Sequence, residues 1–463
     1  MIFLERVMKF SGIGRYLGAV AVLISVLSVA DCKKKEGDDT AMFAVLAAAS
    51  DPCFGSAGPC YRFTPDVTES EISDKMNTAQ YGSTFVFSPG TYSITNSLVL
   101  RERGITIKGF GKDVSVLDFT GMTIAGKGGI DVVGDGFSIR DITIRNTKGD
   151  GIRVEASTGV NIQRLKVEWT GTPSAANGAY GIYPVKSFNV LMEDCESYGA
   201  SDAGIYVGQT NGAIVRRNIA KRNVAGIEIE NTRNASVYDN IAEDNTGGLV
   251  IFDLNNPVSG GNIKMYNNTI TSNNRANFGA GFVASIPPGT GTFVMATSDV
   301  EIFGNTYTSN KTVDLAVISA YAFDATLATQ LATNAAGANP PLNPFARNVY
   351  IHNNTFIGGG TAPDGTNPGV NALGALIAGY YGAGGFNTIV DSILYDGLDN
   401  PDPTQDNAGN NTINLCVKDN TGASFADLDL KNQPDPSNMV RIAAGASLGV
   451  FGCNGTAQTG AGF

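Results

Sequence analysis

A short repeat dominates this sequence. Gly-Ile or Gly-Leu pairs recur at intervals of 22, 30, 23, 22 and 22 residues, beginning at Gly129, Gly151, Gly181, Gly204, Gly226 and Gly248. A unit of about 22 residues holds only two or three short strands and tight turns, so it cannot bury an apolar face alone and must stack on its neighbours. We therefore predict an all-β fold, a right-handed parallel β-helix in which a single chain winds through roughly ten to twelve coils.

Asparagines follow the same period. They stand three residues after an apolar residue at Asn218, Asn240, Asn268, Asn305 and Asn354, and a second series lies five residues further on at Asn223, Asn245, Asn273 and Asn310. Stacked coils bring equivalent residues to about 4.8 Å from one another. We expect a structural ladder of side-chain amides. Cys195 occupies the same column in an earlier coil, so we interpret it as a small buried hydrophobe.

Both ends of a solenoid need a cover. Residues 69–80 have helix-forming composition with Ile72 and Met76 on one face, which predicts a cap on the first coil. Regular repetition fades beyond about Asp396. The expected organisation is a signal segment (1–31), a tether (32–65), the β-helix (66–400) and a C-terminal cap (401–463). Longer loops at 170–179, 255–262, 276–290, 320–347 and 358–371 are expected either to gather on one face or to be tolerated decoration.

The first thirty residues are typical of a secretory signal. Arg6, Lys9 and Arg15 precede a short apolar run, and the run ends at LSVADC, which is similar to a lipobox. We predict lipidation of Cys32 and anchoring to the cell envelope, on the periplasmic face or the outer surface; ordinary cleavage with a free Cys32 is the alternative. An oxidising compartment favours two disulfides. The expected pairs are Cys53 with Cys60 and Cys416 with Cys453.

Charge and composition exclude several classes of function. A net charge of −11 repels nucleic acid. The single histidine, His352, argues against zinc or copper sites and is interpreted as an exposed turn residue. Motifs of the CxxC, HExxH and P-loop types do not occur in the sequence. We predict no metal and no cofactor.

Strand alternation predicts one informative surface. If the isoleucines of the Gly-Ile pairs point inward, the residues that follow them point outward on consecutive coils. This places Arg153, Tyr183, Tyr206 and Glu228 in one outer column. The candidate ligand-binding residues on or beside this face are Arg153, Tyr183, Asp202, Tyr206, Gln209, Glu228 and Glu230. The alternative is a cross-strand ladder that only stabilises the sheet.

Several segments resemble a known family. GIYPVKSFNVLMED from Gly181, YGASDAGIYVGQ from Tyr198, NVAGIEIENT from Asn223 and VYDNIAEDNTGGLVIFDL from Val237 resemble an exported bacterial family of parallel β-helix repeat lipoproteins, and CVKDNTGASFADLDL from Cys416 is similar to its C-terminal signature. The likeness covers most of residues 66–453. It implies an extracytoplasmic protein often encoded beside a dihaem cytochrome, and hence a possible cytochrome partner. More distantly the chain resembles the pectate lyase-like superfamily.

Three functions are therefore expected. The first is binding of a polysaccharide or another envelope glycan through the tyrosine face, because flat rings flanked by charged groups suit sugars. The second is a polysaccharide lyase or uronate C5-epimerase, in which Arg153 neutralises a uronate and Tyr183 or Tyr206 transfers a proton. The third is a non-catalytic scaffold for an extracytoplasmic partner such as the cytochrome. Whether the protein is an enzyme stays open.

Overall fold

A computed structural model describes residues 51–53, 55–366, 370–385, 389–399, 411–432 and 435–453. The chain divides into two units, residues 1–56 and 57–463, and the architecture below is that of the second. The predicted signal segment and lipidated Cys32 lie outside the described residues. The described helices include none long and apolar enough to cross a membrane.

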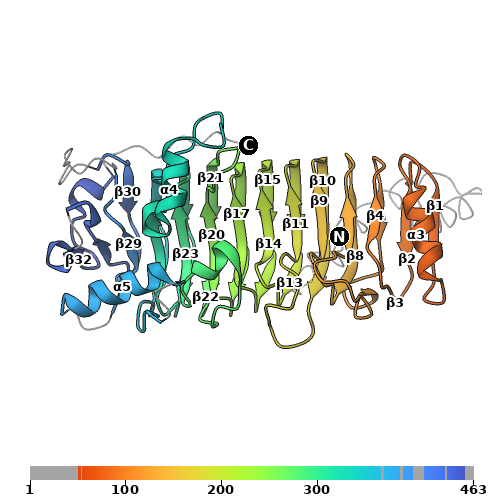
Figure 1. The fold of residues 1–463 in the computed structure, drawn as a ribbon, viewed down its shortest axis with the longest axis horizontal. Coiled ribbons are helices and arrows are strands. Elements are labelled where there is room, and N and C mark those ends of the chain that lie inside the picture. The colour runs from red at the N-terminus through yellow and green to blue at the C-terminus, as the bar shows by residue number, and fades with distance from the viewer. Residues whose placement is uncertain are drawn as a thin grey trace, which may run out of the picture. The chain divides into compact units, whose positions relative to one another are not determined.

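The described residues between 57 and 453 form a right-handed parallel β-helix, as the repeat predicts (Figure 1). In the described part of the chain, sheet B holds eleven parallel strands and one antiparallel strand, β32, at its C-terminal end. The strands of sheet B are β4 (Leu98–Leu100), β7 (Ile130–Val132), β9 (Ile152–Glu155), β11 (Ile182–Val185), β14 (Ala203–Gly208), β17 (Ala225–Glu230), β20 (Gly247–Phe252), β23 (Thr290–Met295), β26 (Val313–Ile318), β29 (Ile393–Tyr395), β31 (Phe425–Asp427) and β32 (Val440–Ile442).

Sheet A forms the rest of each coil and is twenty-stranded within the described residues. From β12 onward most coils contribute two strands to it, one on each side of the turn that carries the asparagine column. Its strands are β1 (Cys60–Phe63), β2 (Thr84–Phe87), β3 (Gly90–Ser93), β5 (Thr106–Lys108), β6 (Ser115–Asp118), β8 (Ser138–Arg145), β10 (Thr158–Glu168), β12 (Phe188–Glu193), β13 (Glu196–Tyr198), β15 (Asn211–Arg216), β16 (Ile219–Lys221), β18 (Arg233–Tyr238), β19 (Ile241–Glu243), β21 (Gly261–Tyr266), β22 (Thr269–Thr271), β24 (Ser298–Phe303), β25 (Thr306–Thr308), β27 (Arg347–His352), β28 (Thr355–Ile357) and β30 (Leu415–Lys418).

The recurring glycine of the repeat lets successive coils approach closely. A Cβ atom at Gly181 would lie 2.4 Å from the carbonyl oxygen of Gly204 in the next coil, and one at Gly226 would lie 2.5 Å from that of Gly248. Any larger residue there would push the coils apart. The isoleucine after each glycine is buried between the sheets, in a continuous apolar core.

The asparagine ladder is present and is longer than the sequence pattern indicates. The Asn218 Nδ2 atom donates to Asn240 Oδ1 at 3.0 Å, and the Asn240 Nδ2 atom donates to Asn268 Oδ1 at 2.9 Å. Each amide oxygen also accepts a backbone N–H of the preceding coil. The ladder continues through Asn305 and Asn354 to Asn420, which the sequence analysis does not identify. The second series forms a parallel ladder from Asn223 to Asn310.

The two ends are closed in different ways. Helix α3 (Glu69–Asn77) covers the N-terminal coil with Ile72 and Met76 buried in the core, as predicted (Figure 1). Coil pairing continues past residue 400, where the repeat pattern places the boundary, because β30 and β31 pair with β27 and β29. The predicted Cys416–Cys453 disulfide is present. Cys53 and Cys60 are both disulfide-bonded, and Cys195 is a free, buried thiol as expected.

The inserted loops gather on the outer face of sheet B. The 3₁₀ segment η1 (Gly281–Ser285) and the helices α4 (Ala325–Ala332) and α5 (Ala372–Ala383) bury apolar residues in a second cluster, which also holds outward-facing side chains of β20, β23, β26 and β29. The ring centroids of Phe252 and Phe282 lie 4.7 Å apart. This part of sheet B is therefore buried on both faces.

The first prediction concerns the ladder. Asn240→Leu removes an amide that is 1% exposed and leaves Asn218 and Asn268 each short of a partner, so we expect the free energy of unfolding to fall by about 1 to 3 kcal/mol. Denaturant unfolding measures the change. The matched control is Asn211→Leu, since the exposed Asn211 bonds one neighbouring amide at the surface and should cost less than about 0.5 kcal/mol. Equal losses in both variants would contradict a structural role specific to the ladder.

Candidate functional site

The register of the outer column on sheet B is as the sequence predicts. Arg153 of β9 pairs with Tyr183 of β11, and Tyr206 of β14 pairs with Glu228 of β17. Strand β11 pairs with β14 through Ile182 opposite Ile205, which places Tyr183 and Tyr206 on adjacent coils. Gly208 lies opposite Glu230.

The exposure of this column differs from the expectation. Strand β9 alternates buried and half-buried positions, whereas every residue of β14 and β17 is buried. Tyr206 and Glu228 are each 2% exposed, so the prediction that they form an open outer face is wrong. The physical reason is the second apolar cluster, which includes Tyr206 and to which the 276–290 insertion contributes Val283 and Ile286. A Cβ atom at Gly208 would lie 2.1 Å from the Tyr206 hydroxyl oxygen, so the Tyr206 ring occupies the space beside this glycine.

Three tyrosines meet where this cover begins. The centroids of the Tyr180 and Tyr183 rings are 4.4 Å apart, and each lies 4.7 Å from the centroid of Tyr206. Tyr180 and Tyr183 are half-buried residues, whereas Tyr206 is buried. The sequence analysis does not identify Tyr180, which stands in the turn just before the Gly181-Ile182 pair; its place beside a repeat glycine is the available signal.

Three carboxyl groups lie behind the tyrosines. Glu228 interacts with the carboxyls of both Asp202 and Glu230, and Gln209 Nε2 donates to Glu230 Oε1 at 3.4 Å. Glu228 and Glu230 are buried, while Asp202 is half-buried at the edge. Glu228 forms side-chain hydrogen bonds with both Asp202 and Glu230, and Asp202 forms another with Tyr180. The structure thus brings Asp202, Gln209, Glu228 and Glu230 together with Tyr206, as one group that we name the acidic cluster.

Burial and mutual repulsion keep this cluster protonated. Burial, with the neighbouring Glu230 carboxylate, raises the pKa of Asp202 to about 7. Burial also raises the pKa of Glu230 and raises that of Glu228 well above its usual range. Protons shared between the carboxyls turn repulsion into hydrogen bonds. The carboxyl group nearest solvent therefore changes its protonation close to neutral pH.

Arg153 stands apart from the acidic cluster. Its Nη2 atom lies 2.7 Å from Glu155 Oε2, and its guanidinium lies 5.6 Å from the centroid of the Tyr183 ring. Asp150, which the sequence analysis does not identify, is half-buried nearby, and burial raises its pKa to about 6. Together, Asp150, Arg153, Tyr180, Tyr183, Asp202 and Gln209 form a half-buried rim around the buried residues Tyr206, Glu228 and Glu230.

Tyrosine chemistry does not fit this arrangement. Proton abstraction by a tyrosine requires a lowered pKa, yet burial raises the pKa of Tyr183 to about 12 and raises that of Tyr206 further. Within the described residues no group of three His, Cys, Asp or Glu side chains has a geometry that could hold a metal ion. The groups at this site able to exchange protons near neutral pH are carboxyls.

His352 is not the exposed turn residue that the sequence suggested. It ends strand β27 and stacks against Phe303, with ring centroids 5.1 Å apart and planes 9° from parallel. Its Nε2 atom lies 3.1 Å from Glu301 Oε1. Tyr238, Tyr266 and Phe303 continue the same stack on the outer face of sheet A. This stack contains one ring from each successive coil, so we interpret His352 as a structural member of the stack.

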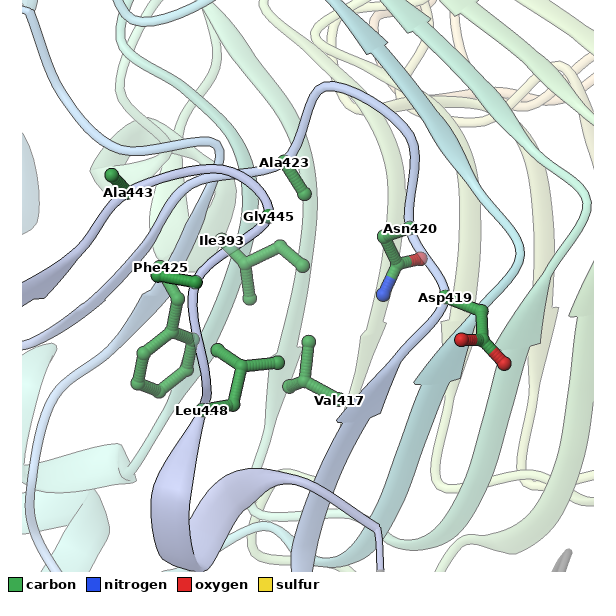
Figure 2. Close-up of a pocket in the computed structure, with 10 residues that line it drawn as sticks. Ile393, Val417, Asp419, Asn420, Ala423, Phe425, Ala443, Gly445 and Leu448 are labelled. Carbon is green, nitrogen blue, oxygen red and sulfur yellow. The ribbon is translucent and has the colours of Figure 1, made fainter.

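A pocket of about 260 Å³ lies elsewhere, at the C-terminal end of the solenoid (Figure 2). Its lining is mostly apolar, with Val417, Phe425 and Leu448 facing one another and Asp419 at one side. The Asn420 amide is already engaged by the ladder, because its oxygen accepts from Asn354 and its nitrogen donates to Ile351. This pocket lies between the last coil and its cap, and the polar side chains of its described lining are those of Asp419 and Asn420.

The protonated cluster makes stability depend on pH. The folded state holds protons that the unfolded chain releases above about pH 4, so the free energy of unfolding should fall as pH rises from about 4 through 7. Glu228→Gln keeps the shape and cannot ionise. We expect this variant to exceed the parent in stability at pH 8 by on the order of 1 kcal/mol or more and to lose less between pH 5 and pH 8. Urea unfolding at both values measures this, with Glu71→Gln, an exposed residue of α3, as control.

Comparisons with known proteins agree with the fold. The family model described as a right-handed beta helix region matches residues 128–285 and 177–329. A search of curated protein sequences finds no match. The match covers the coils that carry the glycine repeat and the acidic cluster.

Several solved structures are similar at low identity. The mannuronan C-5 epimerase AlgE4 A-module of Azotobacter vinelandii is 18% identical, with 80% of this chain and 93% of that chain covered and a TM-score of 0.49. The alginate lyase of Paenibacillus sp. str. FPU-7 is 16% identical, with 55% of this chain and 90% of that chain covered and a TM-score of 0.42. The exopolygalacturonase of Thermotoga maritima is 10% identical, with 62% of this chain and 82% of that chain covered and a TM-score of 0.41. These likenesses concern the fold alone. The strand pairing of the described residues, with the family match within residues 128–329, establishes a right-handed parallel β-helix.

Proposed function

We propose that this protein binds a glycan at the rim of the acidic cluster on sheet B. The observation that carries the proposal is the half-buried rim itself: two tyrosines, an arginine, two aspartates and a glutamine converge where the covering insertions begin. Elsewhere on sheet B the strands from β14 to β26 are buried at every position. The rim is thus the place where aromatic and polar groups of this sheet meet solvent together.

Sugars suit such a rim for two reasons. The C–H faces of a sugar ring pack on tyrosine rings, and Tyr180 and Tyr183 are half-buried residues at the edge of the covered surface. Hydroxyl groups of a sugar can accept and donate hydrogen bonds, and Asp202 and Gln209 offer partners at the two ends of β14. Strands β9, β11 and β14 span roughly 10 Å along the solenoid axis, since neighbouring strands are about 4.8 Å apart. A short oligosaccharide fits that length.

The proposal includes a cellular place. An export signal and a lipid on Cys32 would hold the β-helix at the cell envelope, where polysaccharides are abundant. Metabolic labelling with a fatty acid that carries an alkyne tests the anchor, with Cys32→Ser as the control. Loss of labelling in that variant supports it, and unchanged labelling would place the lipid elsewhere or nowhere.

One observation favours a second candidate, a polysaccharide lyase or uronate C5-epimerase. Asp202 is half-buried and changes protonation near pH 7, which suits a general acid or base. In this alternative the carboxyl would replace the tyrosine of the sequence hypothesis. Incubation with alginate and pectate separates the candidates: new unsaturated ends that absorb ultraviolet light indicate a lyase, altered anomeric NMR signals indicate an epimerase, and retention without turnover indicates binding. If none of these three results is seen, the remaining candidate is a non-catalytic scaffold for an extracytoplasmic cytochrome. A pull-down from native envelope tests that candidate.

The binding prediction concerns Tyr183. Tyr183→Ala removes one accessible ring of the rim, so affinity for a bound oligosaccharide should fall by on the order of 1 kcal/mol or more, measured by isothermal titration calorimetry. The matched control is Tyr238→Ala, which removes a half-buried stacked tyrosine from sheet A and should leave affinity unchanged. Equal affinities for Tyr183→Ala and the parent, with folding intact, would place the binding surface elsewhere.

A further inference from the structure

Each rung of the first asparagine ladder supplies two donors to the next. The backbone N–H and one side-chain N–H of Asn305 both donate to Asn354 Oδ1, at 3.0 and 2.9 Å. Those of Asn354 both donate to Asn420 Oδ1, at 2.9 and 3.0 Å. Two N–H groups of each rung therefore converge on one acceptor oxygen in the following coil. The last rung needs such an oxygen from another source.

Asn420 has the geometry of the earlier rungs. Its Nδ2 atom donates to the Ile351 carbonyl oxygen at 2.9 Å, as Asn354 Nδ2 donates to the Ile302 carbonyl oxygen at the same distance. The residue before it, Asp419, has a φ of 51°, and the residue before Asn354 has a φ of 53°. The backbone N–H and the second side-chain N–H of Asn420 are therefore directed at the place where a further rung would stand. Within the described residues, neither of these two donors meets an acceptor.

The second ladder shows how such an end is satisfied. Its last rung, Asn310, donates both its backbone N–H and its Nδ2 N–H to the Asp314 carboxyl, the latter at 2.9 Å. Asp314 is 1% exposed, so it closes that ladder from inside the protein. The described part of the chain supplies no equivalent oxygen at Asn420. The two ladders thus end differently, one on a buried acceptor and the other at a pocket.

The pocket at the end of the solenoid lies beside these two donors. Asn420 is one of its lining residues, and in Figure 2 the nitrogen of its amide is turned toward the apolar side chains and the oxygen away from them. The lining includes the Asp419 carboxylate and, among the described residues, no lysine or arginine. An anion would lose its hydration there without a cation to balance it. The pocket therefore favours a neutral acceptor that is attached to an apolar group.

We propose that this pocket binds a small neutral molecule in which an amide is joined to a short apolar chain. The amide oxygen takes the position of the next rung and accepts from the backbone N–H and the Nδ2 N–H of Asn420. The apolar chain packs against Val417, Phe425 and Leu448. An amide fits because the acceptor at every rung of this ladder is itself an amide oxygen. This site belongs to the last coil and does not depend on the glycan rim of sheet B.

The test titrates the full chain, deuterated and labelled with ¹⁵N, with hexanamide at pH 7.5 and follows amide signals by NMR. We expect the backbone and side-chain N–H signals of Asn420 to shift and to saturate. Hexanoate has the same chain with a charged head, and acetamide has the same head without the chain, so each should bind about tenfold more weakly or worse. Unmoved Asn420 signals, or hexanoate that binds as tightly as hexanamide, would overturn the proposal. Because the full chain is titrated, a pocket that another part of the protein already fills gives no binding, which overturns it too.

Variants separate the pocket from the rest of the last coil. Asn420→Asp removes the side-chain donors and keeps an oxygen for Asn354, so affinity for hexanamide should fall by about tenfold or more. Ala423→Leu leaves Asn420 intact and fills part of the pocket, so it should weaken binding by a similar factor. Asn414→Asp, the same change at an exposed asparagine of that coil, should leave affinity unchanged.

Circular dichroism confirms that each variant folds. If Asn420→Asp does not fold, Ala423→Leu decides the question, since it alters the pocket and no member of the ladder. Parent-like affinity in Ala423→Leu, or an equal loss in Asn414→Asp and Asn420→Asp, would place the amide outside this pocket and overturn the proposal.

Discussion

Register between stacked coils is the constraint on which this structure depends. Each coil is held to the next by parallel strand pairs and by hydrogen bonds between side-chain amides, such as the bond from Asn240 to Asn268. Glycines such as Gly181 allow the backbones to approach, and a side chain there would collide with the next coil. Because side chains alternate strictly along a strand, a slip of one residue would exchange core and surface in every coil. The ladder thus fixes which side chains reach the outer face of sheet B.

The insertions then decide what that face can do. Outward residues of β20 and β23 would be exposed on a bare solenoid, yet Phe252 and Phe293 are fully buried beneath the inserted segments. The N-terminal strands of sheet B lack this cover, as the half-buried Arg153 and Tyr183 show. The acidic cluster lies at the boundary, with its floor in the second apolar cluster and its rim in solvent. Burial raises the pKa values of the three carboxyls, and the position at the boundary leaves the rim residues partly exposed to solvent.

Sequence reasoning reached the fold and the register because both follow from a period that is visible in one dimension. It identified Arg153, Tyr183, Asp202, Tyr206, Gln209, Glu228 and Glu230, and the structure brings all but Arg153 into one connected group. It did not foresee the burial of Tyr206 and Glu228, because the second apolar cluster that includes Tyr206 draws on insertions with no period of their own. Asn420 was missed for a related reason, since a long irregular stretch separates it from Asn354. Where coverage depends on long-range contacts, alternation along a strand specifies direction and leaves exposure undetermined.

Buried carboxyl groups make the folded state less stable than apolar residues at the same positions would. Their presence in the acidic cluster therefore supports a role in binding. A protein that needed only to fold could fill the places of Glu228 and Glu230 with apolar residues, as it does at Val250 and Phe252, which pair with them on the next coil. Replacing buried charged groups by apolar ones of similar size is often neutral or stabilising. A cross-strand ladder, the structural alternative, would also avoid acids placed side by side, because like charges on neighbouring strands repel. The two glutamates instead lie behind the half-buried Asp202 and share hydrogen bonds with its carboxyl and with each other, which requires that protons stay in the cluster.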